Sequence, residues 1–281
     1  MIKKIAVVGG GTMGLGIAQT FAMAGFETLL FDIDAVSLAN AQQTIKKNLA
    51  IGVQKNKFSA TQMDDTLALL SFSNELSAVV ADLVVEAIVE RLEVKINLFG
   101  SLSLQNSDLC IFGSNTSSLS ITKMAAGIPN PERVIGIHFF NPAHLMRLVE
   151  VISGSKTSSV VAQSIFDLCQ KIGKYPVMVR DTPGFIVNRV ARSYYTESLK
   201  TLEEGVADIK TIDRLLENAG FAMGAFRLMD TIGNDVNLAV TKSLFEGFFG
   251  EPRFRPSRLQ QQKVDAGLLG KKTGEGFYKY D

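Results

Sequence analysis

The sequence predicts an α/β protein in which a doubly wound, mostly parallel sheet is followed by a smaller all-α domain. In the first part of the chain, short β-branched apolar runs alternate with longer helical patterns, as in parallel sheets with crossover helices. A Gly-x-Gly-x-x-Gly turn joins the first such run to the first helical pattern. Beyond residue 184 no strand run of comparable quality follows, so the remainder should be helical.

Length and composition fit two domains of ordinary globular character. The chain has 281 residues, of which 46% are hydrophobic and 20% are charged, so disorder is not expected. The 29 Lys and Arg residues nearly balance the 28 Asp and Glu residues, so no net positive field would attract a nucleic acid. We therefore expect no nucleic-acid partner, and any anionic ligand must be bound locally.

The compartment is inferred from cysteines and apolar runs. Cys110 and Cys169 lie in apolar stretches, which favours buried thiols over a disulfide framework. No signal-peptide pattern precedes Gly9, and no apolar run approaches the roughly 18 to 20 residues of a spanning helix. We expect no membrane association, no metal and a cytoplasmic location, although a processed chain in an organelle matrix would look the same.

The elements before residue 181 are short strands separated mostly by helical stretches. Ser59 and Gln62 resemble a capping box at a helix start, and Asp34 could cap the helix after the second strand. The first helix is expected from about Met13 to Ala24. The strand candidates are Ile5–Val8, Thr28–Phe31, Leu83–Val85, Leu109–Phe112, Val134–Ile137, Leu148–Ile152 and Pro176–Val179.

The pattern changes at Asp181-Thr182-Pro183-Gly184, where proline fixes φ and glycine permits a turn that other residues resist. We place the domain boundary here, which gives domains of residues 1–183 and 184–281. Helices are expected over residues 185–204, 209–218 and 228–249, and the glycine-rich tail from Gly270 is expected to be a loop.

A dinucleotide site is predicted at the glycine turn. Gly9, Gly11 and Gly14 directly follow the first strand and open the first helix, with Thr12 and Met13 between them. In a Rossmann-type fold these glycines allow the tight turn, the approach of a pyrophosphate and close helix packing. The unpaired N–H groups at the helix start would then face the phosphates.

Asp32 closes the second strand, near the roughly 20-residue offset at which an acid binds the adenosine ribose. Its carboxylate would repel a 2′-phosphate, so the predicted cofactor is NAD rather than NADP. A solvated or helix-capping aspartate is the alternative.

His138 and Glu150 form the candidate catalytic pair. His138 ends a strand candidate, and the edge where parallel strands end is where ligands collect. Imidazole titrates near neutral pH and can take or return an alcohol proton while a hydride is transferred. Glu150 lies in the next strand candidate between apolar neighbours, where its charge would be costly unless paired. A His138–Glu150 pair would resolve that cost; a purely structural histidine is the alternative.

A family resemblance rests on five segments that occur in order along the chain. They are the glycine turn, Ser114-Asn115-Thr116-Ser117-Ser118, the stretch from His138 to Glu150, Asp181-Thr182-Pro183-Gly184-Phe185-Ile186-Val187-Asn188-Arg189, and Lys271-Lys272-Thr273-Gly274-Glu275-Gly276-Phe277-Tyr278. Together they resemble the 3-hydroxyacyl-CoA dehydrogenases, in particular the short bacterial 3-hydroxybutyryl-CoA dehydrogenases. The resemblance implies NAD-dependent interconversion of (S)-3-hydroxyacyl-CoA and 3-oxoacyl-CoA, in a cleft between the two domains.

The resemblance also implies roles for individual residues. His138 matches the family's catalytic base and Glu150 its orienting carboxylate. Ser117 and Asn188 match groups around the C3 oxygen and the thioester carbonyl of the substrate, and their hydroxyl and amide can hydrogen-bond without adding charge. Residues matched to the cofactor side are Glu90, Lys95, Asn115, Ser117 and Asn141. For Glu90 and Lys95, a solvated charged helix face is the alternative.

Recognition of CoA and assembly are less well defined by the sequence. Lys55, with Lys46, Lys47 and Lys57, forms a basic cluster that could meet the CoA phosphates, although exposed lysines are common. The family implies that the helical domain shapes the acyl end and forms a homodimer or a higher homo-oligomer. Ala225, Arg227 and Asn234 depart from the usual family pattern, which leaves acyl-chain preference and assembly open.

Two other functions are compatible with the fold. Dehydrogenases of free hydroxy acids or sugar acids combine a similar turn with a helical domain but use a catalytic lysine. A dinucleotide-binding structural protein without turnover would keep the fold alone. The His138, Glu150, Ser117 and Asn188 set favours the acyl-CoA enzyme over both.

Overall fold

The structure is a computed structural model that describes residues 2–280. The chain divides into two compact units, one ending at Asp181 and the other beginning at Thr182. Each unit is described by itself. No helix within the described part of the chain is both long and apolar enough to cross a membrane.

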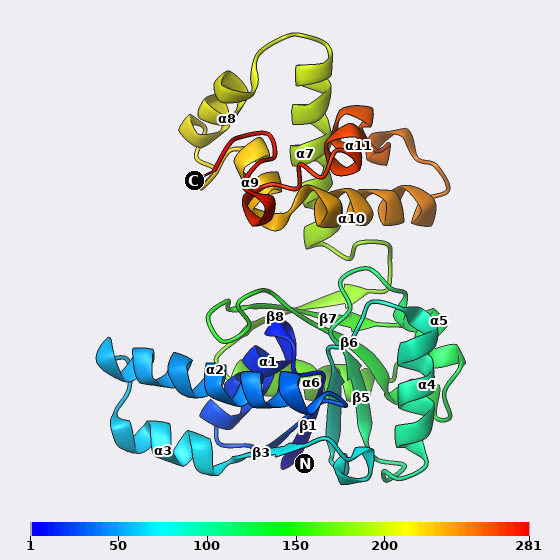
Figure 1. Cartoon of the computed structure of the whole chain (residues 1–281). Coiled ribbons are helices and arrows are strands. Elements are labelled where there is room, and N and C mark those ends of the chain that lie inside the picture. Colours follow the sequence, from blue (N-terminus) through cyan, green and yellow to red (C-terminus); the bar gives the residue numbers. More distant parts are fainter. Residues whose placement is uncertain (1, 281) are drawn as a thin grey trace. The chain divides into compact units, whose positions relative to one another are not determined.

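The first unit is built on an eight-stranded sheet with the order β3-β2-β1-β4-β5-β6-β7-β8. Figure 1 shows this sheet with helices around it. Strands β1 to β6 are parallel, β7 is antiparallel to β6, and β8 is parallel to β7. The predicted doubly wound, mostly parallel sheet is therefore confirmed. The strands are β1 (Lys4–Val8), β2 (Glu27–Phe31), β3 (Leu70–Ser73), β4 (Leu83–Glu86), β5 (Ile111–Ser114), β6 (Val134–Phe139), β7 (Leu148–Ser153) and β8 (Tyr175–Arg180).

Helices cover both faces of this sheet because alternate strand residues point to opposite sides. On one face, Ile5 and Val7 of β1 share a buried cluster with Phe21 of α1 and Ile165 of α6. On the other face, the Phe99 ring of α4 lies 5.3 Å from the Phe112 ring of β5. The helices are α1 (Thr12–Met23), α2 (Ala35–Gln54), α3 (Ala60–Ala68), α4 (Leu92–Ser103), α5 (Ile121–Ala126) and α6 (Ser159–Lys171).

Several local predictions are confirmed and others are corrected. The Ser59–Gln62 capping box opens α3, and the Asp34 carboxylate caps α2. Cys110 and Cys169 are free and buried, as expected. Strand β5 starts at Ile111 rather than Leu109, whose side chain is exposed to solvent. The short strand β3 was not predicted.

The second unit is helical. Its described residues contain no strand, only the isolated bridges Gly270↔Glu275 and Glu275↔Lys279. The single helix expected over 228–249 is wrong: Gly233, with φ of 101°, ends one helix and begins the next. The helices are α7 (Val187–Glu203), α8 (Ile209–Asn218), α9 (Ala225–Ile232), α10 (Asn234–Gly247) and α11 (Arg258–Asp265), the last of which was not predicted.

The glycine-rich tail is held to this unit by the buried carboxylate of Asp230. That carboxylate accepts hydrogen bonds from the backbone N–H groups of Phe277 and Tyr278, both at 2.9 Å, and from the Tyr280 hydroxyl at 3.0 Å. The Phe277 side chain packs in the core of the unit against Phe226. The tail motif therefore has a structural function in this unit.

Candidate active site at the carboxyl edge of the sheet

The glycine turn lies at the carboxyl end of β1. At two of its positions a larger residue would clash with the backbone. Gly9 has φ of 109°, and a Cβ there would lie 2.7 Å from the Ala87 carbonyl oxygen. A Cβ on Gly14 would lie 1.7 Å from the Gly9 carbonyl oxygen. Gly11, by contrast, has open space around it and precedes α1 without a side-chain cap. This geometry leaves room for a phosphate at the start of α1.

Asp32 follows β2 and is bonded to the glycine turn. Its Oδ2 accepts a hydrogen bond from the Gly10 N–H at 2.6 Å, and its Oδ1 accepts one from the Asp34 N–H at 2.9 Å. The carboxylate is therefore held beside the turn by two backbone donors. Such a fixed carboxylate suits ribose hydroxyls and disfavours a neighbouring phosphate.

A buried charge cluster lies at the ends of β4 and β5. The Lys95 ammonium of α4 lies 2.8 and 2.7 Å from the two carboxylate oxygens of Glu86 and 3.1 Å from Glu90. Glu86 is fully buried and Lys95 is 1% exposed, which rules out the solvated helix face considered for Lys95. Burial raises the pKa of Glu86, and the Lys95 charge opposes that rise.

Glu90 holds the loop that contains Ser117. Its Oε1 accepts hydrogen bonds from the Thr116 hydroxyl and, at 3.1 Å, from the Ser117 N–H. Asn115 links the end of β5 to the end of β6, because its Oδ1 accepts a hydrogen bond from the Phe139 N–H at 2.8 Å. The loop after β5 is thus fixed to β4 and to β6.

His138 and Glu150 are a cross-strand pair. They are directly opposite in the antiparallel β6–β7 ladder, and His138 Nδ1 lies 2.7 Å from Glu150 Oε2. His138 is 6% exposed and Glu150 is fully buried. The predicted pairing is confirmed, and it explains how a carboxylate is tolerated between the apolar residues of β7.

Asn141, Asn188 and the basic cluster are the other predicted residues. Asn141 follows β6 and is exposed, and Asn188 belongs to α7 in the second unit. The four lysines of the basic cluster are exposed on α2 or just after it. Burial lowers the pKa of His144, and Lys174 and Lys57 lower it further. The residues of the basic cluster are Lys46, Lys47, Lys55 and Lys57.

Neither Glu86 nor Thr116 was singled out from the sequence, nor was Lys174, whose ammonium donates to the Ala143 and Met146 carbonyl oxygens. Glu86 is a charged residue at the end of the apolar run of β4, the same signal that identified Glu150. Thr116 and Lys174 are not charged residues within an apolar strand pattern. Their contacts depend on which loops lie next to each other in the folded protein.

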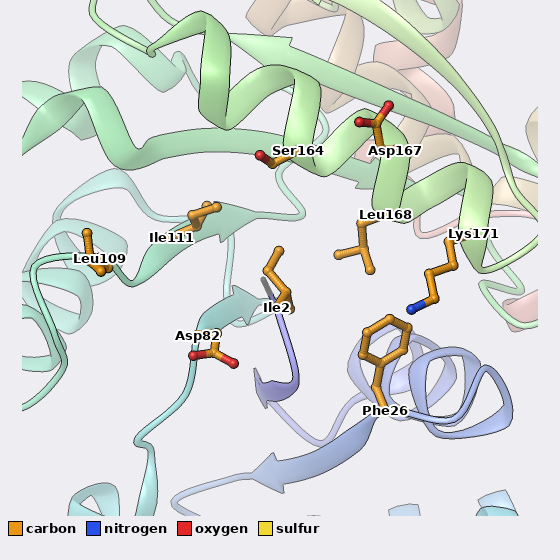
Figure 2. Close-up of a pocket in the computed structure, with 9 residues that line it drawn as sticks. All are labelled: Ile2, Phe26, Asp82, Leu109, Ile111, Ser164, Asp167, Leu168 and Lys171. Atoms are coloured by element: carbon orange, nitrogen blue, oxygen red, sulfur yellow. The ribbon is translucent and has the colours of Figure 1, made fainter.

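A separate cavity of about 410 Å³ opens at the opposite edge of the sheet. Figure 2 shows Asp82 just before β4, Ile111 at the start of β5, and the Lys171 amine above the Phe26 ring. These are the amino ends of the strands, whereas the glycine turn and His138 lie at the carboxyl ends. This cavity is therefore not part of the candidate site.

Comparison with known proteins identifies the family. The profile "3-hydroxyacyl-CoA dehydrogenase, NAD binding domain" matches residues 4–182, and that of the C-terminal domain matches residues 184–280. The chain is 48% identical to 3-hydroxyadipyl-CoA dehydrogenase of Escherichia coli over 99% of this chain, but it spans only 59% of that protein. It is 41% identical to a probable 3-hydroxybutyryl-CoA dehydrogenase of Bacillus subtilis, covering 100% of this chain and 98% of that one.

Solved structures agree with the sequence matches. The crystal structure titled 3-hydroxybutyryl-CoA dehydrogenase from E. coli K12 superimposes with a TM-score of 0.98 at 48% identity, covering all of this chain and 60% of that one. The structure of (S)-3-hydroxybutyryl-CoA dehydrogenase from Ralstonia eutropha gives a TM-score of 0.97 at 36% identity, with 100% of both chains covered. The chain therefore belongs to the 3-hydroxyacyl-CoA dehydrogenase family, whose NAD-binding and C-terminal domains it carries.

Proposed function

We propose that this chain interconverts a short-chain (S)-3-hydroxyacyl-CoA and the corresponding 3-oxoacyl-CoA, with NAD as the hydride carrier and His138 as the acid–base group. The observation that carries the proposal is the 2.7 Å pair of His138 and Glu150, at the sheet edge that also holds the glycine turn. Membership of the 3-hydroxyacyl-CoA dehydrogenase family supports the same substrate class.

The residues at the carboxyl edge fit a bound NAD. The open space at Gly11 and the fixed carboxylate of Asp32 suit the pyrophosphate and the adenosine ribose. When bound, NAD supplies the acceptor for the hydride from C3 of the substrate. We assign Glu90, Lys95, Asn115, Ser117 and Asn141 to the cofactor side.

The proton of the C3 hydroxyl passes to His138. Because Nδ1 is paired with Glu150, Nε2 is the atom we assign to proton transfer. As the hydroxyl proton reaches Nε2 the ring becomes positively charged, and the buried Glu150 carboxylate stabilises that charge and fixes the ring orientation. In the reverse direction the same nitrogen returns the proton to the 3-oxo group.

Other residues are assigned to substrate recognition. Ser117 and Asn188 are proposed to hydrogen-bond the C3 oxygen and the thioester carbonyl, and Lys55 to meet the CoA phosphates. Residues 1–183 would form the cofactor domain, and residues 184–281 the substrate and oligomerisation domain. We further propose a cytoplasmic homodimer or higher homo-oligomer.

The names of the relatives point to two acyl groups. One relative is named as a 3-hydroxyadipyl-CoA dehydrogenase and others as 3-hydroxybutyryl-CoA dehydrogenases. The 48% identity to the first makes an acyl group with a terminal carboxylate a specific second candidate.

The decisive assay follows NADH absorbance with acetoacetyl-CoA as oxidant. Free acetoacetate is the control for a free-acid dehydrogenase, 3-oxoadipyl-CoA tests the second candidate, and NADPH tests the cofactor. We expect turnover with one or both CoA esters and NADH, and little with free acetoacetate. Equal turnover of acetoacetate, or no turnover of any oxidant, would contradict the proposal.

A further inference from the structure

The connection between β6 and β7 must keep His138 opposite Glu150. Residues 140–147 form this connection, which is longer than the two to five residues of ordinary hairpin loops. In short hairpins the turn itself fixes the register of the strands. Here the connection is too long for the turn alone to set the register, so contacts that hold the connection add to the five paired positions of the β6–β7 ladder.

Lys174 contacts this connection from the segment just before β8. Its ammonium donates to the Ala143 carbonyl oxygen at 2.6 Å and to the Met146 carbonyl oxygen at 2.8 Å. Lys174 is 8% exposed, and none of the ion pairs within residues 2–280 includes it. Because both hydrogen bonds of the buried Lys174 ammonium go to carbonyl groups of residues 140–147, Lys174 holds this connection in place.

The opposite side of the connection packs against α1. A Cβ built on Gly16 would lie 3.2 Å from the Ala143 Cβ and 3.5 Å from the Ala143 nitrogen. Ala143 itself is 1% exposed. The connection is therefore held between the backbone of α1 and the Lys174 ammonium, with little room to shift.

We propose that Lys174 is a positioning residue for the His138–Glu150 pair, acting through the carbonyl groups of Ala143 and Met146. This inference rests on the function proposed above. The ammonium fixes both carbonyls, and these fix the path of the chain between the strand that ends after His138 and the strand that presents Glu150. Burial lowers the pKa of Lys174, in agreement with its enclosed position.

The kinetic test compares Lys174→Met with Lys171→Met. Methionine keeps the unbranched shape and most of the length of the side chain, but it cannot donate to the two carbonyls. Lys171 is the matched control, because it is an exposed lysine at the end of α6 whose ammonium lies over the Phe26 ring. We expect Lys174→Met to lower kcat by roughly 10- to 100-fold, the cost of a small displacement of a reacting group. KM for NADH should change by less than about twofold, and Lys171→Met should match the wild type.

Two further variants separate positioning from folding. Lys174→Arg keeps donors for both carbonyls and should recover part of kcat. Gly16→Ala adds a methyl group close to Ala143 on the side opposite Lys174. It leaves Lys174 unchanged and should also lower kcat. If Lys174→Met does not fold by circular dichroism, these two variants decide.

Nuclear magnetic resonance gives a readout that does not need turnover. The chain has only two histidines, so a His144→Gln background leaves the His138 ring as the sole imidazole signal. The Nδ1 proton bonded to Glu150 should shift in Lys174→Met and remain unchanged in Lys171→Met. An unchanged His138 signal in Lys174→Met, with or without a loss of kcat, would overturn the positioning role. If the wild type turns over no acyl-CoA, the proposed function fails, and the ring signal still decides the proposal for Lys174.

Discussion

His138 Nδ1 and Glu150 Oε2 lie 2.7 Å apart because β7 runs antiparallel to β6. The antiparallel strand starts at the edge where β6 ends, so its third residue faces the next-to-last residue of β6. The reversal of strand direction thus places a carboxylate beside an imidazole at the edge where the glycine turn also lies. In the proposed mechanism this pairing assigns Nδ1 to Glu150 and Nε2 to proton transfer.

Replacing His138 with alanine should lower kcat by about 10² to 10⁴, the usual contribution of general acid–base catalysis. Affinity for NADH should barely change, because the glycine turn follows β1 and Asp32 follows β2, whereas His138 is on β6. Steady-state kinetics with acetoacetyl-CoA and a fluorescence titration with NADH measure the two effects. A near-normal kcat would remove His138 from the mechanism.

Glu150→Gln should lower kcat by at least about tenfold while the fold is kept. Glutamine keeps the size and an acceptor for the Nδ1 proton, but it removes the charge that stabilises the protonated ring. Glu132→Gln, at an exposed position before β6, is the control. Equal kcat in both variants would show that the Glu150 charge does not contribute to turnover.

Asp32→Ala should weaken NADH binding by about tenfold and narrow the preference for NADH over NADPH. The change removes both the predicted ribose acceptor and the hydrogen bond to Gly10. Asp34→Ala is the control, because Asp34 caps α2 and its loss should cost about 1 kcal/mol of stability without changing the cofactor ratio. An unchanged cofactor ratio in Asp32→Ala would assign Asp32 a purely structural function.

The sheet and the His138–Glu150 pairing were predictable because both depend on simple patterns. Alternating strand and helix patterns indicated the parallel sheet, and the charge of Glu150 inside an apolar strand indicated a partner. The strand β3 was missed because Leu-Ser-Phe-Ser is short and half polar. The break at Gly233 was missed because the apolar spacing continues through it, while the backbone changes to φ of 101°.

The supporting contacts could not be predicted in the same way. Lys174 follows Gly173 in what reads as an ordinary turn, and its partners are backbone carbonyls, which have no sequence signature. Lys95 is seen to be buried only when α4 is packed against β4, where Glu86 ends the strand. Such contacts depend on tertiary packing, so only the structure reveals them.

Lys95→Met should destabilise the protein more at pH 8 than at pH 5. Breaking a buried ion pair costs about 3–5 kcal/mol when the remaining group stays charged. Burial already raises the pKa of Glu86, and loss of the Lys95 charge raises it further. In the folded variant Glu86 is then favoured in its protonated form. The stability that protonated Glu86 contributes is present at low pH and is lost as the pH rises through the folded-state pKa of Glu86.

Urea unfolding at several pH values measures this effect. Lys200→Met is the control, because Lys200 pairs with Glu197 at the surface and its loss should have little effect at any pH. The double variant Glu86→Gln with Lys95→Met should recover part of the stability at pH 8, since no buried charge remains unpaired. A stability loss for Lys95→Met that is independent of pH would contradict the charge argument.

Gly276→Ala should destabilise the helical unit by about 1–3 kcal/mol, the usual cost of overpacking. A Cβ at Gly276 would lie 2.1 Å from Asp230 Oδ1, and that carboxylate cannot move without losing its bonds to the tail. Gly100→Ala is the control: Gly100 lies inside α4 with open space around it, so alanine should be neutral or stabilising there. Thermal unfolding measures both changes. If Gly276→Ala unfolds at the wild-type temperature, the Asp230 contact does not hold the tail in the way described.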